Sequence, residues 1–275
     1  RDSDLAALGV SPEPIGGSFA LDASASAAGK GAYAARIALD SIEIRNKHRT
    51  DRIRPTSVSL HTDSAATRAE AASGDLSLTF STPQSADSLI AALTRSARTL
   101  AGQIDAQSID MEQLKPALPD FALRVSAGPD NILNSLLKSR KIAFDALNAE
   151  GVNCDSLPVS IRLRTEGLAY GNVVLDTVTA DIRQNGKRLE YALGLANAPE
   201  NLDNIARAGL YGHLVRNTGQ ANLYQRNRAG REGFRFGLDV TWTDSLVRAS
   251  VTPPDPLFGF EPWTVNRGNY LAYRF

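Results

Sequence analysis

Strict alternation of apolar and polar residues is the feature that most limits the folds open to this chain. In residues 75–81, DLSLTFS, the side chains of Leu76, Leu78 and Phe80 share one face, because successive side chains of a strand point to opposite sides. The same alternation recurs in residues 158–166, 188–196, 233–242 and 246–253. Strands with one apolar and one wet face are typical of antiparallel sheets. The sequence therefore predicts a mainly β protein with a long antiparallel sheet.

The apolar positions of these strands form the predicted lining of a single sheet face. Each lies in phase with its neighbours two residues away on the same strand. The predicted lining residues are Leu76, Leu78, Phe80, Ile161, Leu163, Leu189, Tyr191, Leu193, Phe234, Phe236, Leu238, Val240, Val247 and Val251.

Short polar segments separate the strands. The Asn185-Gly186 pair between two alternating runs is a strong signal for a tight hairpin. Residues 227–232 and 242–245 are further predicted turns. Residues 22–35, rich in Ala, Ser and Gly, are interpreted as a weak strand pair around Gly29–Gly31, with a flexible segment as the alternative.

A helical insertion interrupts the alternation near the middle of the chain. Residues 83–103 predict a helix with an apolar stripe and Ser85 or Asp87 as its cap. Short helices are predicted in 110–120 and 129–139, and strands in 121–127 and 142–150. We therefore divide the chain into an antiparallel β segment at 1–82, a helical insertion at 83–140, and a second β segment at 141–275.

Composition argues against nucleic-acid binding and rules out an internal disulfide. In 275 residues, Lys plus Arg and Asp plus Glu are both 30, and this neutral balance argues against a nucleic-acid-binding protein. The single cysteine, Cys154, cannot form an internal disulfide. No run of 18 apolar residues is present, and no signal peptide is visible at Arg1.

Motifs for catalysis and metal binding are absent. His48, His61 and His213 are far apart in the sequence and lack the spacing of zinc ligands, and no Gly-x-Ser-x-Gly or phosphate-binding loop occurs. Scattered carboxylates are open to pairing as in a glycosidase, but most fall on wet strand positions or strand ends. Trp242 and Trp263 fit either sugar stacking or ordinary packing. We therefore predict no enzymatic activity, no catalytic residue, no metal and no cofactor.

An amphipathic sheet must cover its apolar face. It can pair with a second sheet, close into a barrel, or fold over so that its own halves face each other. The last arrangement leaves an apolar trough, and exposed apolar surfaces of that size usually bind a ligand or partner.

Four segments carry a resemblance to a known family. Residues 60–89, 121–133, 209–240 and 263–275 are similar to TamB-type translocation and assembly module proteins of diderm bacteria, and the helical insertion resembles the Bacteroides-type branch. The most distinctive motif is WTVNRGNY in the last of these segments.

The resemblance implies both a fold and a function. It implies a long sheet curled into a taco-like trough with an apolar interior, in a periplasmic protein that an N-terminal helix anchors in the inner membrane. It further implies that the trough conducts phospholipid between the two membranes, or assists outer-membrane protein assembly with a TamA-type barrel partner. On this interpretation residues 1–275 are a piece of a longer trough, and 263–275 continue it; an ordinary terminal strand is the alternative.

A second functional class stays open. A β-sandwich adhesin or carbohydrate-binding module, with two apolar faces sealed against each other, would show the same alternation.

Overall fold

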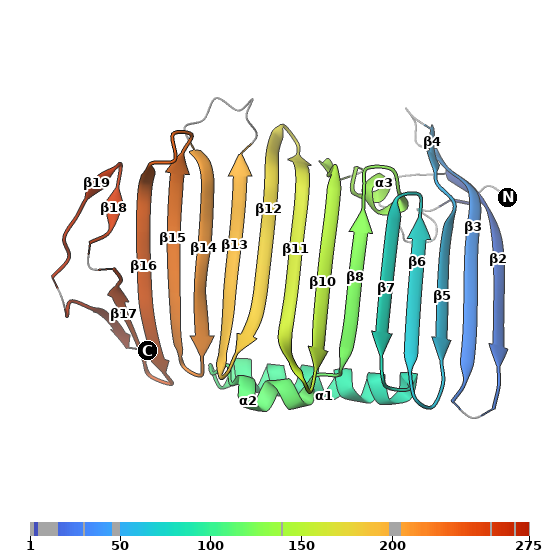
Figure 1. Cartoon of the computed structure of the whole chain (residues 1–275), viewed down its shortest axis with the longest axis horizontal. Coiled ribbons are helices and arrows are strands. Elements are labelled where there is room, and N and C mark those ends of the chain that lie inside the picture. Colours follow the sequence, from blue (N-terminus) through green and yellow to red (C-terminus); the bar gives the residue numbers. More distant parts are fainter. Residues whose placement is uncertain are drawn as a thin grey trace.

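The computed structural model describes residues 3–4, 16–29, 31–45, 50–138, 140–197, 205–253, 255–266 and 268–274. These residues form one antiparallel sheet with short helices at its margins (Figure 1). The first strands are β1 (Ser3–Asp4), β2 (Gly16–Ala27), β3 (Tyr33–Arg45), β4 (Thr50–Ile53), β5 (Thr56–Thr62), β6 (Thr67–Ser73) and β7 (Leu76–Thr82). The middle strands are β8 (Phe121–Ala127), β9 (Ile142–Ala143), β10 (Ala146–Cys154), β11 (Leu157–Tyr170), β12 (Val173–Asn185) and β13 (Arg188–Asn197). The last strands are β14 (Ile205–Val215), β15 (Thr218–Asn227), β16 (Glu232–Thr243), β17 (Leu246–Val251), β18 (Leu257–Phe258), β19 (Glu261–Pro262) and β20 (Leu271–Arg274).

The main strands follow one another across the sheet in chain order. Antiparallel pairing runs β2, β3, β5, β6, β7, β8, β10, β11, β12, β13, β14, β15, β16, β17 and β20. Short strands extend this row: β1 pairs with β2, β4 with β3, β9 with β11, and β18 with β16 and β19. Tight turns make this order possible, and the predicted Asn185-Gly186 turn joins β12 to β13 with Gly186 at a φ of 58°.

The helices lie at the two ends of the strands. Helix α1 (Ala86–Asp105), α2 (Met111–Leu114) and the 3₁₀ turn η1 (Lys115–Ala117) run along one end, and α3 (Ile132–Lys138) lies at the other end near β7 and β8 (Figure 1). Ser85 caps α1, because its Oγ accepts a hydrogen bond from the Ser88 amide at 3.3 Å. All these helices fall within the predicted insertion, which also contains β8, a full member of the sheet.

Buried residues are few, and a buried apolar cluster lies where α2 meets the sheet. Met111 and Leu114 of α2 pack with Val159 of β11, and Leu189 of β13 joins them at the edge of the cluster. At the other end the Asn134 side chain of α3 is fully buried, and its Nδ2 donates to the Phe144 carbonyl at 2.8 Å. The first contact places α2 on the apolar side of the sheet, and the second fixes α3 to the segment before β10.

The predicted antiparallel β class is confirmed, whereas the described sheet is neither closed nor strongly curled. Its strands pair in one row, and among the described residues no second sheet packs on the apolar side. The described residues therefore form neither a taco-like trough nor a sealed β-sandwich. The physical reason is that the helices contact only the strand ends, and nothing in the described part of the chain draws the two edges of the sheet together.

A candidate apolar ligand-binding face

Two rows of apolar residues cross the sheet at right angles to its strands. Directly paired residues of neighbouring strands point to the same face, so the pairing register defines each row. The first row is Ala25, Ala35, Leu60, Ala69, Phe80, Leu123, Gly151, Ile161, Ile182, Tyr191, Gly212, Ala221, Leu238 and Val251. The second row is Ala23, Ile37, Val58, Ala71, Leu78, Val125, Ala149, Leu163, Ala180, Leu193, Leu210, Leu223 and Phe236. We call the surface formed by these two rows the apolar face.

The apolar face is exposed to solvent on several strands between β3 and β15. Large side chains on it keep 40–46% of their surface exposed in three separate regions: Ile37, Val58 and Leu60; Ile161; and Leu193 and Leu223. In an ordinary core such residues would be buried. A contiguous apolar surface of this extent on a protein usually has a ligand or partner.

All fourteen predicted lining residues belong to this side of the sheet. Phe80, Ile161, Tyr191, Leu238 and Val251 lie in the first row, and Leu78, Leu163, Leu193 and Phe236 lie in the second. The other five are in phase with them nearer the strand ends: Leu76, Phe234, Leu189, Val240 and Val247. The register therefore brings together residues that are up to 175 positions apart in the sequence, from Leu76 to Val251.

Several members of the face are not among the predicted lining residues. Ile37, Val58 and Leu60 lie on β3 and β5, where Ala and Ser residues weaken the contrast between the two faces. Val58 and Leu60 do alternate with Ser57, Ser59 and His61, so the signal was present but short. Leu210 and Leu223 were hidden by the Gly and Asn residues around them in β14 and β15.

Two glycines in the first row make room for aromatic rings. A Cβ at Gly212 would lie 2.8 Å from the Tyr191 hydroxyl oxygen, and a Cβ at Gly151 would lie 3.1 Å from the Phe121 ring. Phe121 in turn stacks with Phe80, with ring centroids 6.4 Å apart. The glycines thus leave room in the first row for two bulky rings.

Tyr191 contributes the one hydroxyl group of the two rows. Its Oη donates to the Gln220 carbonyl oxygen at 2.9 Å, and burial raises the pKa of this phenol. A buried polar group that already has its partner adds little polarity to the surface around it. The apolar face therefore offers van der Waals contact and no free directional group in its two rows.

Helices border the apolar face at both ends of the strands. The amide of Ala86 in α1 donates to Thr62 Oγ1 at 3.0 Å, and Thr62 is in phase with Leu60. At the opposite end, the amide of Ile132 in α3 donates to Ser73 Oγ at 3.1 Å. The helices thus limit the face along the strands, whereas it remains open across them.

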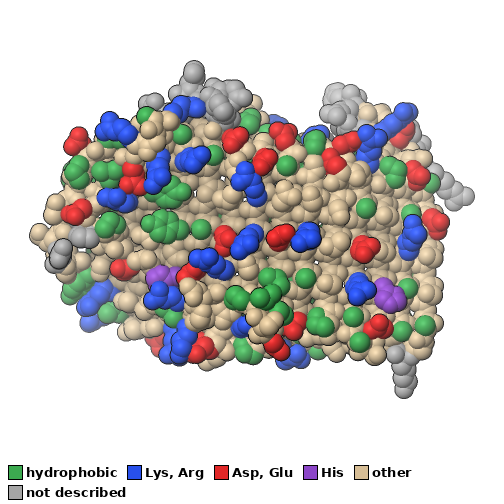
Figure 2. All heavy atoms as spheres, in the orientation of Figure 1, with side chains coloured by type: hydrophobic (Ala, Val, Ile, Leu, Met, Phe, Trp, Pro, Cys, Tyr) green, Lys and Arg blue, Asp and Glu red, His purple; other side chains and the backbone are tan. Residues whose placement is uncertain are grey.

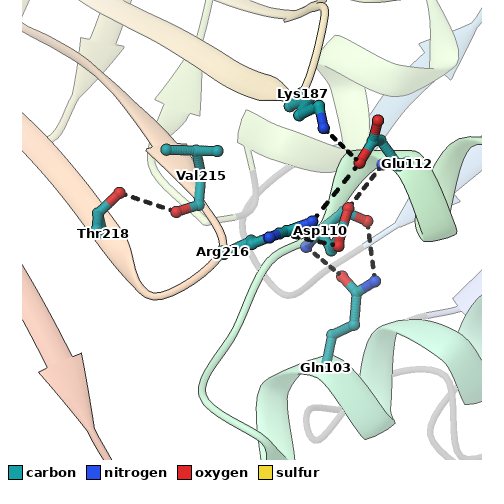
Figure 3. A network of polar contacts seen from close by, with 7 residues as sticks. All are labelled: Gln103, Asp110, Glu112, Lys187, Val215, Arg216 and Thr218. Atoms are coloured by element: carbon teal, nitrogen blue, oxygen red, sulfur yellow. Dashed lines mark hydrogen bonds and ion pairs between the residues drawn. The ribbon is translucent and has the colours of Figure 1, made fainter.

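Figure 3 shows how polar contacts hold the helical border in place. Arg216, in the β14–β15 turn, lies 3.3 Å from the Asp110 carboxylate and 3.7 Å from Glu112, and Lys187 of the β12–β13 turn lies 3.1 Å from Glu112. Gln103 of α1 exchanges two hydrogen bonds with the Asp110 backbone, at 3.0 and 3.1 Å. A backbone bridge between Ile109 and Arg216 completes the attachment of the insertion to the sheet.

The opposite face of the sheet is polar. Figure 2 views this face, on which basic and acidic side chains alternate across the middle strands. The ion pairs Arg124–Glu150, Arg162–Asp181 and Arg183–Glu190 have N–O distances of 3.3, 3.2 and 2.8 Å. Hydrogen bonds from Asn185 and Arg183 lower the pKa of Glu190, which keeps it ionised. Hollows of about 360–570 Å³ lie between these side chains, so this face is suited to water and polar solutes.

The histidines and tryptophans considered as possible site residues occupy separate places in the fold. His61 and His213 lie on β5 and β14, 152 positions apart in the sequence, and His48 lies outside the described residues. Within the described ranges, no group of three or more His, Cys, Asp or Glu side chains is close enough to hold a metal ion. Trp242 donates its indole N–H to the Gln107 carbonyl and so joins β16 to the segment that follows α1. Trp263 is 60% exposed and packs edge-on against Phe258.

Comparison with known proteins gives no match to a family model, to a curated protein or to a solved structure. In the part of the chain that the structure describes, no helix has both the length and the apolar character needed to cross a bilayer.

Proposed function

We propose that this chain is a non-enzymatic periplasmic module of a TamB-like protein, and that phospholipid acyl chains move along its apolar face between the inner and outer membranes. In this proposal the full-length protein is anchored in the inner membrane by an N-terminal helix and works with a TamA-like barrel in the outer membrane. Assistance to outer-membrane protein assembly is a second use of the same surface. The observation that carries the proposal is the pair of unbroken apolar rows, which no other described element covers.

An acyl chain suits this face for a physical reason. It needs no hydrogen-bonding partner, and each methylene removed from water contributes about 0.8 kcal/mol. The rows run perpendicular to the strands, so a chain lying along them would meet apolar side chains from strand to strand. A sugar, by contrast, needs donors and acceptors, which the rows lack.

In this proposal, the curled trough that the resemblance implies is the ligand-bound form of the sheet. We propose that the open sheet curls further around a bound chain, which would bring more of each row into contact. Glycines in the first row, such as Gly151 and Gly212, give the sheet positions with no side chain to resist curling.

The test uses two neighbouring residues on opposite faces of β13. Leu193 lies on the apolar face and is 46% exposed, and Ala192 lies beside it on the polar face. Leu193→Arg should fold, because an open face lets the guanidinium reach water, yet it should carry several-fold less copurifying phospholipid. Ala192→Arg adds the same side chain to the polar face and should retain the wild-type amount.

Lipid is measured by mass spectrometry of organic extracts from purified protein, and folding by circular dichroism. Wild-type protein without phospholipid, or equal lipid in both variants, would contradict the proposal. Loss of folding in Leu193→Arg alone would indicate that this face is a closed core in solution.

A further inference from the structure

A basic and apolar corner lies at the α3 end of the sheet, away from the apolar face. There the tip of the β11–β12 hairpin lies beside the segment that follows α3. The Gly171 amide donates to the Lys141 carbonyl at 2.9 Å, and Tyr170 pairs with Ile142 of β9. We call Lys138, Arg140, Lys141, Tyr170 and Val173 the hairpin-tip patch.

The patch is held on a fixed base. Asn134 in α3 is fully buried, and its side chain bonds the backbone of Phe144 in both directions, at 2.8 and 3.3 Å. Phe144 itself is 3% exposed. Lys138, Arg140 and Lys141 fall between these two anchors in the sequence, and the Lys141 carbonyl contacts the hairpin tip.

The segments that form the hairpin-tip patch are basic, and the nearby Asp145 carboxylate lies outside them, beside Gly167. Residues 138–143 and 168–175 contain three cations and no Asp or Glu. In the described structure none of the ion pairs uses Lys138, Arg140 or Lys141, and all three are exposed. A hollow of about 500 Å³ beside them is lined by Lys138, Lys141, Ile142, Ala143, Ala169, Gly171 and Asn172.

Apolar groups stand next to these cations at the hairpin tip. Tyr170 is 67% exposed and Val173 is 57% exposed, and the two are directly paired across the hairpin. A two-residue turn, Gly171-Asn172, projects them from the end of the sheet. A tip that exposes an aromatic and a branched aliphatic side chain beside basic residues has the composition of a membrane-interface anchor.

We propose that the hairpin-tip patch docks this protein on the surface of an anionic bilayer. Lys138, Arg140 and Lys141 would contact lipid phosphates, while Tyr170 and Val173 enter the headgroup region. The charge complementarity is local. The whole chain has a formal net charge of zero, so an anionic bilayer exerts no overall attraction on it. This inference goes beyond lipid conduction, because docking needs no ligand on the apolar face.

The test is flotation of the purified protein with phosphatidylcholine vesicles, with and without 30% phosphatidylglycerol, at low and high salt. We expect binding only to the anionic vesicles and weakening by salt. Lys138→Gln with Lys141→Gln should reduce partitioning about thirtyfold, since each basic residue near an anionic surface is worth about 1 kcal/mol and 1.36 kcal/mol is tenfold. Tyr170→Ser with Val173→Ser should also reduce it.

The matched control removes two exposed arginines of α1, at the opposite end of the strands, through Arg95→Gln with Arg98→Gln. It should leave partitioning unchanged. An equal loss in this control, or no binding to anionic vesicles, would overturn the proposal. So would unchanged binding of the Tyr170→Ser, Val173→Ser variant together with equally tight binding to a DNA oligonucleotide, because the patch would then recognise any polyanion.

Discussion

The hydroxyl of Tyr191 on β13 donates to the carbonyl oxygen of Gln220 on β15 at 2.9 Å, across the whole width of β14. The side chain passes over Gly212, the β14 residue that pairs with Tyr191. One tyrosine thus links three strands in the middle of an open, single-layered sheet. Because few residues of this sheet are buried in a common core, such cross-strand contacts carry much of its local order.

Gly212→Ala should destabilise the sheet. The added Cβ would lie 1.8 Å from the Gln220 carbonyl oxygen, which belongs to the backbone and cannot move freely. We expect a loss of about 1–3 kcal/mol in the free energy of unfolding, as for other overpacked sites. Urea denaturation followed by circular dichroism measures the change.

Gly102→Ala is the control for that prediction. Gly102 lies within α1, and a Cβ added there would have no neighbouring atom within 4 Å, so alanine should stabilise the helix by about 0.5–1 kcal/mol. Equal and small effects of the two alanines would show that the crossing over Gly212 is not tight in solution.

Stability should fall at alkaline pH, in part through Tyr191. Burial raises the pKa of this phenol in the folded state, so folding favours its protonated form. That contribution is fully present below the unfolded pKa of about 10 and is lost as pH rises through the higher folded pKa. We expect the wild-type protein to lose stability above about pH 10 more steeply than Tyr191→Phe.

The measurement is the urea midpoint of both proteins between pH 8 and pH 11. At the neutral end Tyr191→Phe should be about 1 kcal/mol less stable, because the Gln220 carbonyl loses its donor. Parallel pH curves for the two proteins would show that Tyr191 titrates as it does in the unfolded chain.

Arg216→Gln should loosen the attachment of the helical insertion without unfolding the sheet. It removes the ionic contacts to Asp110 and Glu112, while leaving the backbone bridge to Ile109. Because Arg216 is 59% exposed, the loss in global stability should stay below about 1 kcal/mol. Hydrogen exchange at residues 103–114 should become faster.

Arg124→Gln breaks an exposed ion pair with Glu150, between β8 and β10 on the polar face and outside residues 103–114. Exchange at 103–114 should be unchanged in this variant. If Arg216→Gln behaves in the same way, the bridge and the Met111 cluster alone hold the insertion.

Local patterns predicted the secondary structure well. The alternation of 121–127 corresponds to β8, the Asn185-Gly186 pair forms the β12–β13 turn, and the stripe of 83–103 corresponds to α1. These features depend on contacts between residues close in sequence, and a single strand or helix displays them in full. The shared face of Leu76, Tyr191 and Phe236 was also predictable, because the side-chain period of a strand is two.

What the sequence by itself determined is therefore the composition of the two faces, since each strand must place alternate residues on opposite sides. What only the tertiary structure decided is whether the apolar face is covered, and by what. Curl depends on the summed twist of many strands and on contacts between distant edges, and no local pattern encodes either. Likewise, Lys141 and Tyr170 meet at one corner only because β9 pairs with the end of β11, a pairing of two residues on each strand that is too short to leave a periodic signal.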